Sequence, residues 1–449
     1  TQPPPEGEEQ EGAAVQQNKQ TISIRSTPRP LSTDNVSMGR LLPKLKLTLF
    51  PRRSRAVVAQ MSPLDLLGRQ PINLSTPELQ RFVGGKRILV TGAGGSIGSE
   101  ICRQVMKFCP QSLILLDRAE NALFEIDQEL RHRWIGADIR PYIADICDAP
   151  RIDRVLADEQ PQVVFHAAAH KHVPMMERHP GEAVKNNVFG TKIIADAALA
   201  AGVDAFVMIS TDKAVNPTSV MGATKRVAEL YVQSLNEEAP NDDCRMTNEE
   251  DSSSFVTRSS SSGTCFCAVR FGNVLGSSGS VVPIFQKQIA AGGPLTVTHR
   301  DMRRYFMTIP EASQLVMLAG ALGRGGDICV LDMGEPVNIY DLARDMIRRN
   351  GLVEGRDIEL KITGMRPGEK LFEELANDTD QTTATSHPKI RVWKLPRYTR
   401  GQVGQMMSEL HDIIEAPAEH VVRSLMSVVP EYQPASPKRA VTMTLSEAA

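Results

Sequence analysis

A polar turn with acid, amine and hydroxyl groups follows one apolar run of the sequence. The run Ala205 to Ser210 has the composition of a buried strand. The residues that follow it are Thr211, Asp212 and Lys213. Such a set of side chains in one turn supplies the groups that general acid–base catalysis uses. The next predicted helix carries Met221 and Lys225 one turn apart, and therefore on one face.

A glycine-rich turn lies earlier in the chain, in KRILVTGAGGSIGSE at 86–100, between an apolar run and a helical pattern that starts at Ser99. Glycines lack Cβ and allow close approach of the backbone, and N–H groups at a helix N-terminus bind anions, so this turn suits a nucleotide pyrophosphate. An ordinary Gly-rich turn is the alternative. The cofactor-binding residues that the turn predicts are Gly92, Gly95, Ser96, Ile97 and Gly98.

An acidic residue at the end of the second predicted strand supports the dinucleotide interpretation. The apolar run 113–116 ends in Asp117, about twenty residues past the last glycine, where dinucleotide folds place a ribose-binding acid. A carboxylate accepts hydrogen bonds from both ribose hydroxyls and repels a 2′-phosphate, so Asp117 predicts NAD as the cofactor. The adjacent Arg118 would accommodate that phosphate, and NADP is therefore the alternative.

Two more strand ends carry candidate cofactor contacts. A third strand is predicted around Tyr142 to Ile143, and Asp145 and Ile146 follow it. Asp145 would either bind the adenine amino group or cap the helix that begins near Ala149. The fourth strand, 163–166, leads into small residues that let a flat cofactor pass close to the backbone, among them Ala167 and Ala168.

Basic residues lie just beyond the fourth strand. They are His170, Lys171 and His172. Ligands bind at the carboxyl ends of the strands in parallel sheets, so these side chains are candidates for ligand contact. We expect no metal here, because no cysteine or carboxylate lies at ligand spacing from the histidines.

The order of predicted elements indicates the fold class. Strands alternate with helices from Lys86 onward, which predicts an α/β fold: a Rossmann-type doubly wound parallel sheet with a smaller carboxy-terminal α/β substrate-binding region. The predicted divisions are a disordered arm at 1–61, an NAD(P)-binding domain at 62–271 with a low-complexity insertion at 236–263, a substrate-binding region at 272–395 and a helical or disordered tail at 396–449.

Cations in turns bounded by glycine or proline mark the second region. They are Arg303, Arg304, Arg366 and Lys370. Cations in such rigid turns suit a diphosphate ligand, although each is equally an ordinary solubilising charge. For Arg366, which glycine and proline flank, we predict ligand contact.

The composition of the 449 residues limits the function classes. A net charge of −2 gives no electrostatic case for nucleic acid or an anionic membrane surface. The seven cysteines are scattered, which predicts neither a disulfide framework nor a zinc site, and favours a reducing, cytoplasmic location. No apolar run is long enough to cross a membrane. For the basic and apolar stretch 41–53 a solvated linker is favoured over a membrane-surface contact, because Pro43 interrupts any amphipathic helix.

Six stretches carry a specific resemblance that spans roughly residues 60 to 395. They are VTGAGGSIGSE, HAAAHKHVPMME, STDKAVNPTSVMGATKR, VRFGNVLGSSGSV, RRYFMTIPEA and GMRPGEKLFEEL. In them the chain resembles the extended short-chain dehydrogenase/reductases that act on nucleotide sugars. Among these it resembles the CapD-like polysaccharide biosynthesis proteins, which are UDP-N-acetylglucosamine 4,6-dehydratases.

The resemblance implies a UDP-sugar substrate, a homo-oligomer, and membrane association if an upstream membrane region like that of many relatives precedes this chain. It implies acid–base work by the turn after the fifth strand, with Lys225 at the nicotinamide ribose. The substrate-binding residues that it implies are Lys171, Asn273, Ser280, Val281, Arg304, Arg366 and Glu369.

Met221 departs from the wider superfamily, which has a tyrosine at this position. A thioether takes no proton, so a catalytically silent nucleotide-sugar-binding protein is one alternative, and a UDP-sugar epimerase or oxidoreductase is another. The CapD-like branch includes members with the same methionine, which implies an active dehydratase. In its reaction, hydride leaves C4 of the sugar, a base removes the C5 proton, water departs from C6 and hydride returns there. The stereochemistry at C5 stays open.

Overall fold

The computed structural model describes residues 76–236, 263–374, 382–394 and 396–434, which lie in one compact unit of the chain, 54–449. The predicted arm and the interior of the predicted insertion fall outside these residues. Asn236 belongs to the fold and not to the insertion. Its side-chain amide accepts the Phe266 N–H at 3.1 Å and donates to the Phe266 carbonyl at 3.2 Å.

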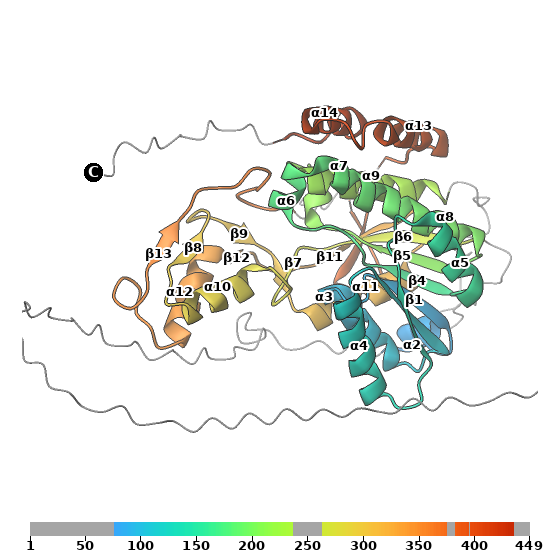
Figure 1. The fold of residues 1–449 in the computed structure, drawn as a ribbon, viewed down its shortest axis with the longest axis horizontal. Coiled ribbons are helices and arrows are strands. Elements are labelled where there is room, and N and C mark those ends of the chain that lie inside the picture. Colours follow the sequence, from blue (N-terminus) through green and yellow to red (C-terminus); the bar gives the residue numbers. More distant parts are fainter. Residues whose placement is uncertain (1–75, 237–262, 375–381, 395, 435–449) are drawn as a thin grey trace, which may run out of the picture. The chain divides into compact units, whose positions relative to one another are not determined.

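A nine-stranded sheet forms the centre of the described chain, in the order β14-β15-β11-β6-β5-β4-β1-β2-β3 (Figure 1). All neighbours are parallel except that β15 runs antiparallel to both β11 and β14. The predicted doubly wound, mostly parallel sheet is thus confirmed. The strands are β1 (Arg87–Thr91), β2 (Ser112–Asp117), β3 (Ile139–Ile143), β4 (Val163–His166), β5 (Ala205–Ile209), β6 (Cys265–Arg270), β11 (Ile328–Leu331), β14 (Thr382–Ala384) and β15 (Ile390–Trp393).

The strand order creates a ligand-binding edge. Successive strands step outward from β1 through β2 to β3, and then the chain returns to place β4 on the other side of β1. The loops that leave β1 and β4 therefore diverge at the carboxyl edge, which is where open α/β sheets bind ligands. Both predicted cofactor loops, the glycine turn after β1 and the small residues after β4, lie at this switch point.

Helices cover both faces of the sheet because alternate strand residues point to opposite sides. Ile88 and Val90 of β1 join one apolar core, and Leu89 between them joins the other. The first core is covered by α2 (Pro77–Val83), α3 (Ser96–Met106), α4 (Glu120–Arg133) and α11 (Ile309–Leu322). The second is covered by α5 (Ala149–Glu159), α6 (Val173–Arg178), α7 (Pro180–Ala183), α8 (Gly190–Ala200) and α9 (Val220–Ser234).

The last two described helices add a further layer over α9. Buried residues of α13 (Arg400–His411) and α14 (Ala418–Val428) belong to the same apolar core as α9. Beyond α14, the Gln433 N–H donates to the Pro217 carbonyl at 2.9 Å, in the segment that leads into α9. The predicted carboxy-terminal tail is therefore helical and packed at Arg400–His411 and Ala418–Val428.

A smaller apolar core lies in the segment after β6. It contains Leu275, Phe285, Leu295, Phe306 and Met346, among others. Its elements are β7 (Asn273–Val274) paired with β10 (Phe306–Met307), β9 (Arg303–Arg304) with β12 (Val337–Asn338), β8 (Leu295–Val297) with β13 (Leu360–Ile362), and the helices α10 (Val281–Ala290) and α12 (Ile339–Arg349). Because β11, β14 and β15 from the same segment return to the main sheet, the division at residue 271 does not separate two sheets.

Close backbone packing marks the first turns of two helices, α3 and α8. The start of α3 differs from the predicted Ser99. Helix α3 begins at Ser96 and so includes Gly98, where an added Cβ would lie 2.0 Å from the Gly92 carbonyl oxygen. A π-helical segment, Val184–Phe189, leads directly into α8. At Gly190 an added Cβ would lie 2.6 Å from Ile146, so the chain passes too close to the neighbouring loop for any side chain there.

Candidate active site

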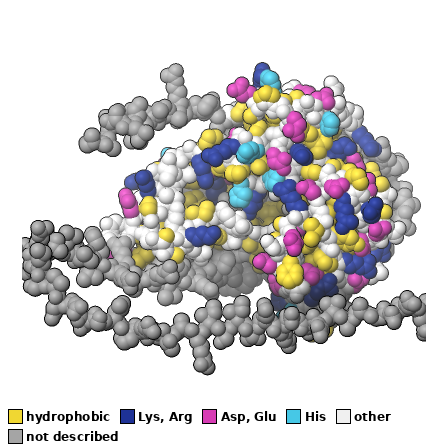
Figure 2. All heavy atoms as spheres, in the orientation of Figure 1, with side chains coloured by type: hydrophobic (Ala, Val, Ile, Leu, Met, Phe, Trp, Pro, Cys, Tyr) yellow, Lys and Arg dark blue, Asp and Glu magenta, His cyan; other side chains and the backbone are white. Residues whose placement is uncertain are grey.

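A cavity of about 770 Å³ opens at the carboxyl edge of the sheet. Its walls come from the glycine turn, the small residues after β4, the polar turn after β5, the N-terminal part of α10 and the turn at 363–373. Lys, Arg and His side chains lie around a hollow on the face shown in Figure 2. Predicted site residues that line the cavity are Gly95, Ser96, Ile97, Gly98, Ala167, Lys171, Thr211, Lys213, Met221, Lys225, Asn273, Ser280, Val281, Arg304, Arg366 and Glu369.

The glycine turn packs closely against the backbone that follows β4. Gly92 has φ +67, and an added Cβ there would lie 2.9 Å from the Ala167 carbonyl oxygen. Gly95 caps α3 without a side-chain hydrogen bond, and Gly95 to Gly98 line the cavity. N–H groups at the start of α3 therefore have no side-chain cap, and a pyrophosphate fits this cradle.

Asp117 supports the glycine turn from the end of β2. Its carboxylate accepts the N–H of Gly94 and the N–H of Ala119, both at 2.9 Å. Arg118 points to other partners, because its guanidinium donates to Asp145 Oδ2 at 3.3 Å and contacts His170 Nε2 at 3.0 Å. Asp117, Arg118 and Asp145 lie outside the cavity lining.

The cap of α5 settles the alternative left open for Asp145. Asp148 caps the helix by accepting the Arg151 N–H at 3.2 Å, whereas Asp145 accepts the Cys147 N–H at 2.9 Å. The N-cap interpretation of Asp145 is therefore wrong. Ile146 is buried against Gly190 and does not line the cavity.

The residues after β4 divide between core and cavity. His166 is fully buried between the hydroxyls of Thr91 (2.8 Å) and Thr191 (2.9 Å), and burial, aided by Lys225, lowers its pKa to about 3. Ala168 does not line the cavity, whereas His170, Lys171 and His172 do. Burial lowers the pKa of Lys171, and burial together with the Lys171 charge lowers the pKa of His172.

The polar turn after β5 is anchored by the neighbouring strand. The Asp212 N–H donates to the Phe271 carbonyl at 3.1 Å, at the end of β6. Thr211 caps a short 3₁₀ turn and donates its hydroxyl to Asp212 Oδ1 at 2.9 Å. The same oxygen accepts from Lys213 Nζ, also at 2.9 Å. The side chains of Thr211 and Lys213 thus converge on Asp212.

Only part of this turn faces the cavity. Thr211 and Lys213 line it, but the Asp212 side chain is 0% exposed and does not. Asp212 Oδ2 lies beside Gly272, where an added Cβ would be 3.0 Å from it, and has no hydrogen-bond partner among the described residues. Thr211 and Lys213, which line the cavity, both donate to Asp212 Oδ1.

Glu373 is a cavity-lining carboxylate that the sequence reasoning missed. Its Oε1 lies 3.6 Å from Lys213 Nζ and 3.6 Å from Arg304 Nε. Lys213 Nζ also donates to Asn273 Oδ1 at 3.2 Å. Burial lowers the pKa of Lys213, but the Asp212 and Glu373 carboxylates more than offset this effect, so its pKa is raised. One feature of the sequence could have identified Glu373: it lies in the same stretch, GMRPGEKLFEEL, as the predicted cations Arg366 and Lys370.

A second amine of the cavity, Lys225, has a lowered pKa, whereas the pKa of Lys213 is raised. Lys225 is buried on α9, and burial lowers its pKa to about 8 even though Glu229 acts in the other direction. Met221 lies one turn earlier and lines the same cavity. Ser210 donates its hydroxyl to Glu229 at 2.6 Å, and Arg270 Nε donates to the same carboxylate oxygen at 2.6 Å. Lys213 and Lys225 therefore offer a charged and a more readily neutralised amine in one cavity.

The predicted cations of the second region differ in how far contacts within the protein already occupy their donor groups. Arg304 donates to the carbonyls of Arg303 (2.6 Å), Lys370 (2.8 Å) and Leu371 (3.2 Å), so most of its donors hold the turn at 363–373. Lys370 donates to the Val215 carbonyl at 3.0 Å and ties that turn to the segment before α9. Arg366 is more exposed and pairs with Glu369 at 2.7 Å at the cavity edge.

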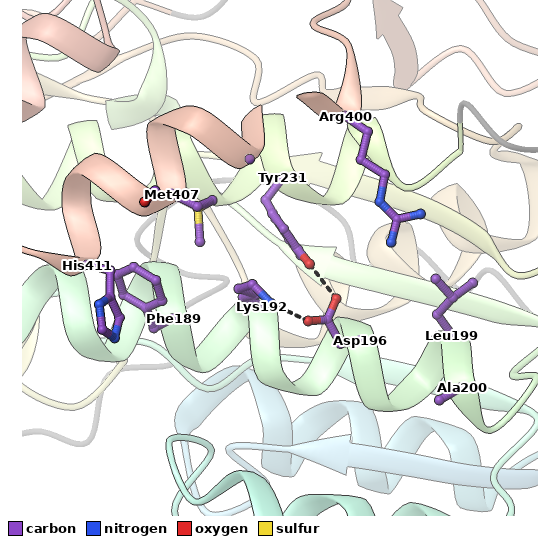
Figure 3. A pocket seen from close by; sticks show the side chains of 11 residues that line it. Phe189, Lys192, Asp196, Leu199, Ala200, Tyr231, Arg400, Met407 and His411 are labelled. Carbon is purple, nitrogen blue, oxygen red and sulfur yellow. Dashed lines mark hydrogen bonds and ion pairs between the residues drawn. The ribbon is translucent and has the colours of Figure 1, made fainter. Parts of the chain in front are cut away.

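A second cavity, of about 650 Å³, lies between α8, α9 and α13 (Figure 3). Asp196 accepts from Lys192 Nζ at 2.5 Å and from the Tyr231 hydroxyl. The rings of Phe189 and His411 pack edge to face with centroids 5.5 Å apart. None of the predicted site residues lines this cavity.

Metal sites and membrane spans are both absent from the part of the chain that the structure describes. No group of three or more His, Cys, Asp or Glu side chains there is arranged to hold a metal ion. Among the described helices, none is both long enough and apolar enough to cross a membrane.

Sequence comparisons place the chain among known proteins. A family model described as "Polysaccharide biosynthesis protein" matches residues 88–395. The capsular polysaccharide biosynthesis protein CapD of Staphylococcus aureus is 51% identical over 77% of this chain and 54% of its own length. A UDP-N-acetylglucosamine 4,6-dehydratase (inverting) of Campylobacter jejuni is 31% identical over 66% of this chain and 79% of its own length. A UDP-glucose 4-epimerase of Rickettsia akari is 31% identical over 67% and 80%. The chain thus spans about half the length of CapD.

Solved structures share the fold. Pen from Bacillus thuringiensis has a TM-score of 0.61 and 33% identity, covering 71% of this chain and 91% of its own. The dTDP-glucose 4,6-dehydratase DesIV of Streptomyces venezuelae, solved with NAD bound, has a TM-score of 0.51 and 21% identity, covering 62% of this chain and 84% of its own. The resemblance predicted from the motifs is confirmed at the level of the family, and the chain belongs to the polysaccharide biosynthesis proteins with an extended short-chain dehydrogenase/reductase fold.

Proposed function

We propose that this chain carries the catalytic unit of an NAD-dependent 4,6-dehydratase that converts UDP-N-acetylglucosamine to its 4-keto-6-deoxy derivative for surface polysaccharide synthesis. The observation that carries the proposal is the position of Lys213, a cavity-lining ammonium between the carboxylates of Asp212 and Glu373. Removal of a C5 proton and loss of the C6 hydroxyl need linked acid and base groups. The dehydratase relative from Campylobacter jejuni supports the same reaction.

NAD is the proposed cofactor, held by the glycine turn and the start of α3. The carboxylate of Asp117 disfavours a 2′-phosphate, and Arg118 is engaged by Asp145 and His170. When bound, the nicotinamide would accept hydride from C4 and return it to C6. Lys225 would orient the nicotinamide ribose, and Ala167 would let the ring pass close to the backbone.

Thr211 is the proposed contact for the C4 hydroxyl. Met221 offers no proton acceptor, whereas the Thr211 hydroxyl lines the cavity and donates to Asp212 Oδ1 at 2.9 Å. The oxygen of Thr211 can take the C4 hydroxyl proton while its own proton passes to Asp212. A hydroxyl relay to a buried carboxylate thus takes over the proton-accepting role of a tyrosine.

Lys213 is the proposed base at C5. Oxidation at C4 makes the C5 proton acidic, and an amine in the cavity can remove it once that amine has given up its own proton. The proposed contacts of the UDP-sugar are Arg366, Glu369, Lys171, and Ser280 and Val281 at the N-terminal part of α10.

A UDP-sugar 4-epimerase is the second candidate, because the Rickettsia akari epimerase is as similar in identity as the dehydratase. Epimerisation needs only oxidation and reduction at C4. It would give no chemical role to Lys213 and its neighbours Asp212 and Glu373. Incubation with UDP-N-acetylglucosamine separates the candidates. We expect a 4-keto-6-deoxy product. A 4-epimer instead would favour the second candidate, and an unchanged substrate with bound nucleotide sugar would indicate a silent binding protein.

We also propose, from the family resemblance, that the protein works as a homo-oligomer in the cytoplasm. Light scattering at working concentration tests the oligomer, and a monomer would contradict it. Cell fractionation tests the location, and full-length protein in the membrane fraction would contradict it.

A further inference from the structure

We propose that Ser96 couples the two ligands of the sheet-edge cavity, so that NAD at the glycine turn increases the affinity of the protein for the diphosphate of the UDP-sugar. The inference rests on the proposed function, because it gives a residue of the cofactor turn a positioning role toward the substrate. Ser96 acts through the loop 276–280, which leads into α10.

The first support is a hydrogen bond between two walls of the cavity. The backbone N–H of Ser278 donates to Ser96 Oγ at 3.1 Å, although the two residues are 182 positions apart in the chain. Ser96 is the first residue of α3, at the glycine turn, and Ser278 lies in the loop between β7 and α10. Both residues line the cavity. The cofactor turn and the loop before α10 are therefore directly connected.

The second support is the way in which the other side of this loop is held. Gly279 has φ +70, and an added Cβ there would lie 2.7 Å from His172 Cε1. The loop therefore packs closely on the residues that follow β4. Ser96 and His172 thus fix the loop from the two strand ends, β1 and β4, that flank the proposed cofactor site.

The third support is what the loop positions. Ser280 is the N-cap residue of α10, but its side chain makes no capping hydrogen bond, and its Oγ is buried without a partner among the described residues. N–H groups at the start of α10 therefore have no side-chain cap and suit an anion. Ser280 and Val281 are proposed contacts of the UDP-sugar, so the position of the loop sets the position of these contacts.

The coupling follows from the two hydrogen-bonding roles of one hydroxyl. A serine hydroxyl has one hydrogen to donate and two lone pairs that accept. The Ser96 oxygen accepts from Ser278, and the Ser96 hydrogen can be donated to a pyrophosphate at the start of α3. Donation to an anion polarises the hydroxyl and strengthens the bond that its oxygen accepts. The loop is then held in place before the diphosphate binds, so that binding orders fewer groups.

The test is a binding cycle with Ser96→Ala. UDP is the probe, because it carries the diphosphate but no sugar that reacts. Calorimetry gives the Kd of UDP for cofactor-free protein and for protein saturated with NAD. We expect NAD to tighten UDP binding to the wild type by about fivefold or more, and this ratio to fall to near one in Ser96→Ala. Because coupling is reciprocal, UDP should tighten NAD binding by the same factor.

Ser99→Ala is the matched control. Ser99 lies further along α3, outside the cavity lining, and its Oγ accepts from Arg103 Nη1 at 3.3 Å. This variant should keep the wild-type ratio, and so should Ser96→Thr, which retains a hydroxyl.

A second pair of variants changes the donor and leaves the cofactor turn intact. Ser278→Pro removes the backbone N–H that donates to Ser96 and should lose the coupling. Ser278→Ala retains this N–H and should keep the coupling. The pair carries the test if Ser96→Ala does not fold or does not bind NAD.

The outcomes separate this inference from the proposed function. Wild-type protein that fails to bind NAD or UDP contradicts the proposed function itself. Binding of both ligands by the wild type without coupling overturns the inference alone. Undiminished coupling in Ser96→Ala or in Ser278→Pro overturns it as well. Weaker UDP binding by Ser96→Ala, by the same factor with and without NAD, would show a structural role only and has the same meaning.

Discussion

The ammonium of Lys213 donates to the carboxylate of the residue directly before it, Asp212, at 2.9 Å. Neighbouring residues in an extended chain point to opposite sides, so this contact requires the 3₁₀ turn that begins at Asp212. The turn gathers acid and base into one cluster behind Thr211.

Lys213→Met keeps the aliphatic stem and removes the amine. We expect both dehydration and deuterium uptake at C5 to fall by about 10² to 10⁴, because the proposed base is gone, while UDP-sugar binding changes little. Product analysis, mass spectrometry of C5 and a binding titration measure the three quantities. Persistent C5 exchange in this variant would move the search for the base to His170, Lys171 and Lys225.

Thr211→Val removes one hydroxyl and preserves the shape of the side chain. Without the relay to Asp212 the C4 hydroxyl loses its proton acceptor, so reduction of bound nicotinamide in a single turnover should slow by about 10² or more. Thr211→Ser restores the hydroxyl and should recover much of that rate. A Val variant as fast as the Ser variant would remove Thr211 from the mechanism.

Lys225→Met should stabilise the cofactor-free protein at neutral pH while it impairs catalysis. Burial lowers the pKa of Lys225 to about 8, so the folded state binds fewer protons than the unfolded state between that pH and the ordinary lysine value. The cost of the buried charge is complete below about pH 8 and disappears as the pH rises through this window. The variant should therefore be more stable than the wild type at pH 7 by on the order of 1 to 3 kcal/mol, and the difference should shrink toward about pH 10.

Thermal unfolding of both proteins at pH 7 and near pH 10 measures this difference. A Met variant that is less stable than the wild type at pH 7 would mean that the Lys225 ammonium has compensating partners in the folded state.

NAD should bind more tightly than NADP. Asp117 disfavours a 2′-phosphate, and Arg118 is held by Asp145 at 3.3 Å and by His170 at 3.0 Å. Asp145→Ala removes one of these partners and should reduce the preference by improving NADP binding. Titrations of cofactor-free wild type and variant with both dinucleotides give the ratios. Clearly tighter NADP binding by the wild type would reverse the assignment.

Removal of residues 237–262, with a short Gly/Ser linker between Asn236 and Gly263, should leave activity largely intact. The motive is the polar, aperiodic composition of the segment. Asn236→Ala should in contrast destabilise the fold by about 1 to 2 kcal/mol, because its amide pairs with both backbone groups of Phe266. Activity and denaturant unfolding of the two proteins measure the contrast, and a deletion variant that fails to fold would show that the segment packs.

Local patterns predicted the sheet and the positions of the loops after β1 and β2, because each depends on neighbouring residues. The apolar runs of β1 and β2, the glycines between them and Asp117 lie within one βαβ unit, where spacing fixes position. The N-cap of α5 could not be predicted with certainty even within such a unit. Asp145 and Asp148 have the same side chain, and only the path of the backbone makes Asp148 the cap.

Contacts between segments that are far apart in the chain could not be predicted from the sequence. Glu373 lies in the same turn as Arg366, but its proximity to Lys213 depends on how that turn folds back over residues far away in the chain. The burial of Asp212 depends in the same way on Gly272 beyond β6. No periodicity encodes either contact, so the residue types of the acid–base cluster were predictable and its geometry was not.

The bond between Gln433 and Pro217 bears on the order in which the protein is made. A ribosome releases the sheet strands β1 to β6 long before α13 and α14, which cover the outer side of α9. Until those helices emerge, the apolar residues of α9 that they cover lack their packing, and the segment before α9 lacks the bond from Gln433. A nascent chain stalled before about residue 400 would therefore expose this surface and be a substrate for chaperones, whereas a chain that includes α13 and α14 covers it.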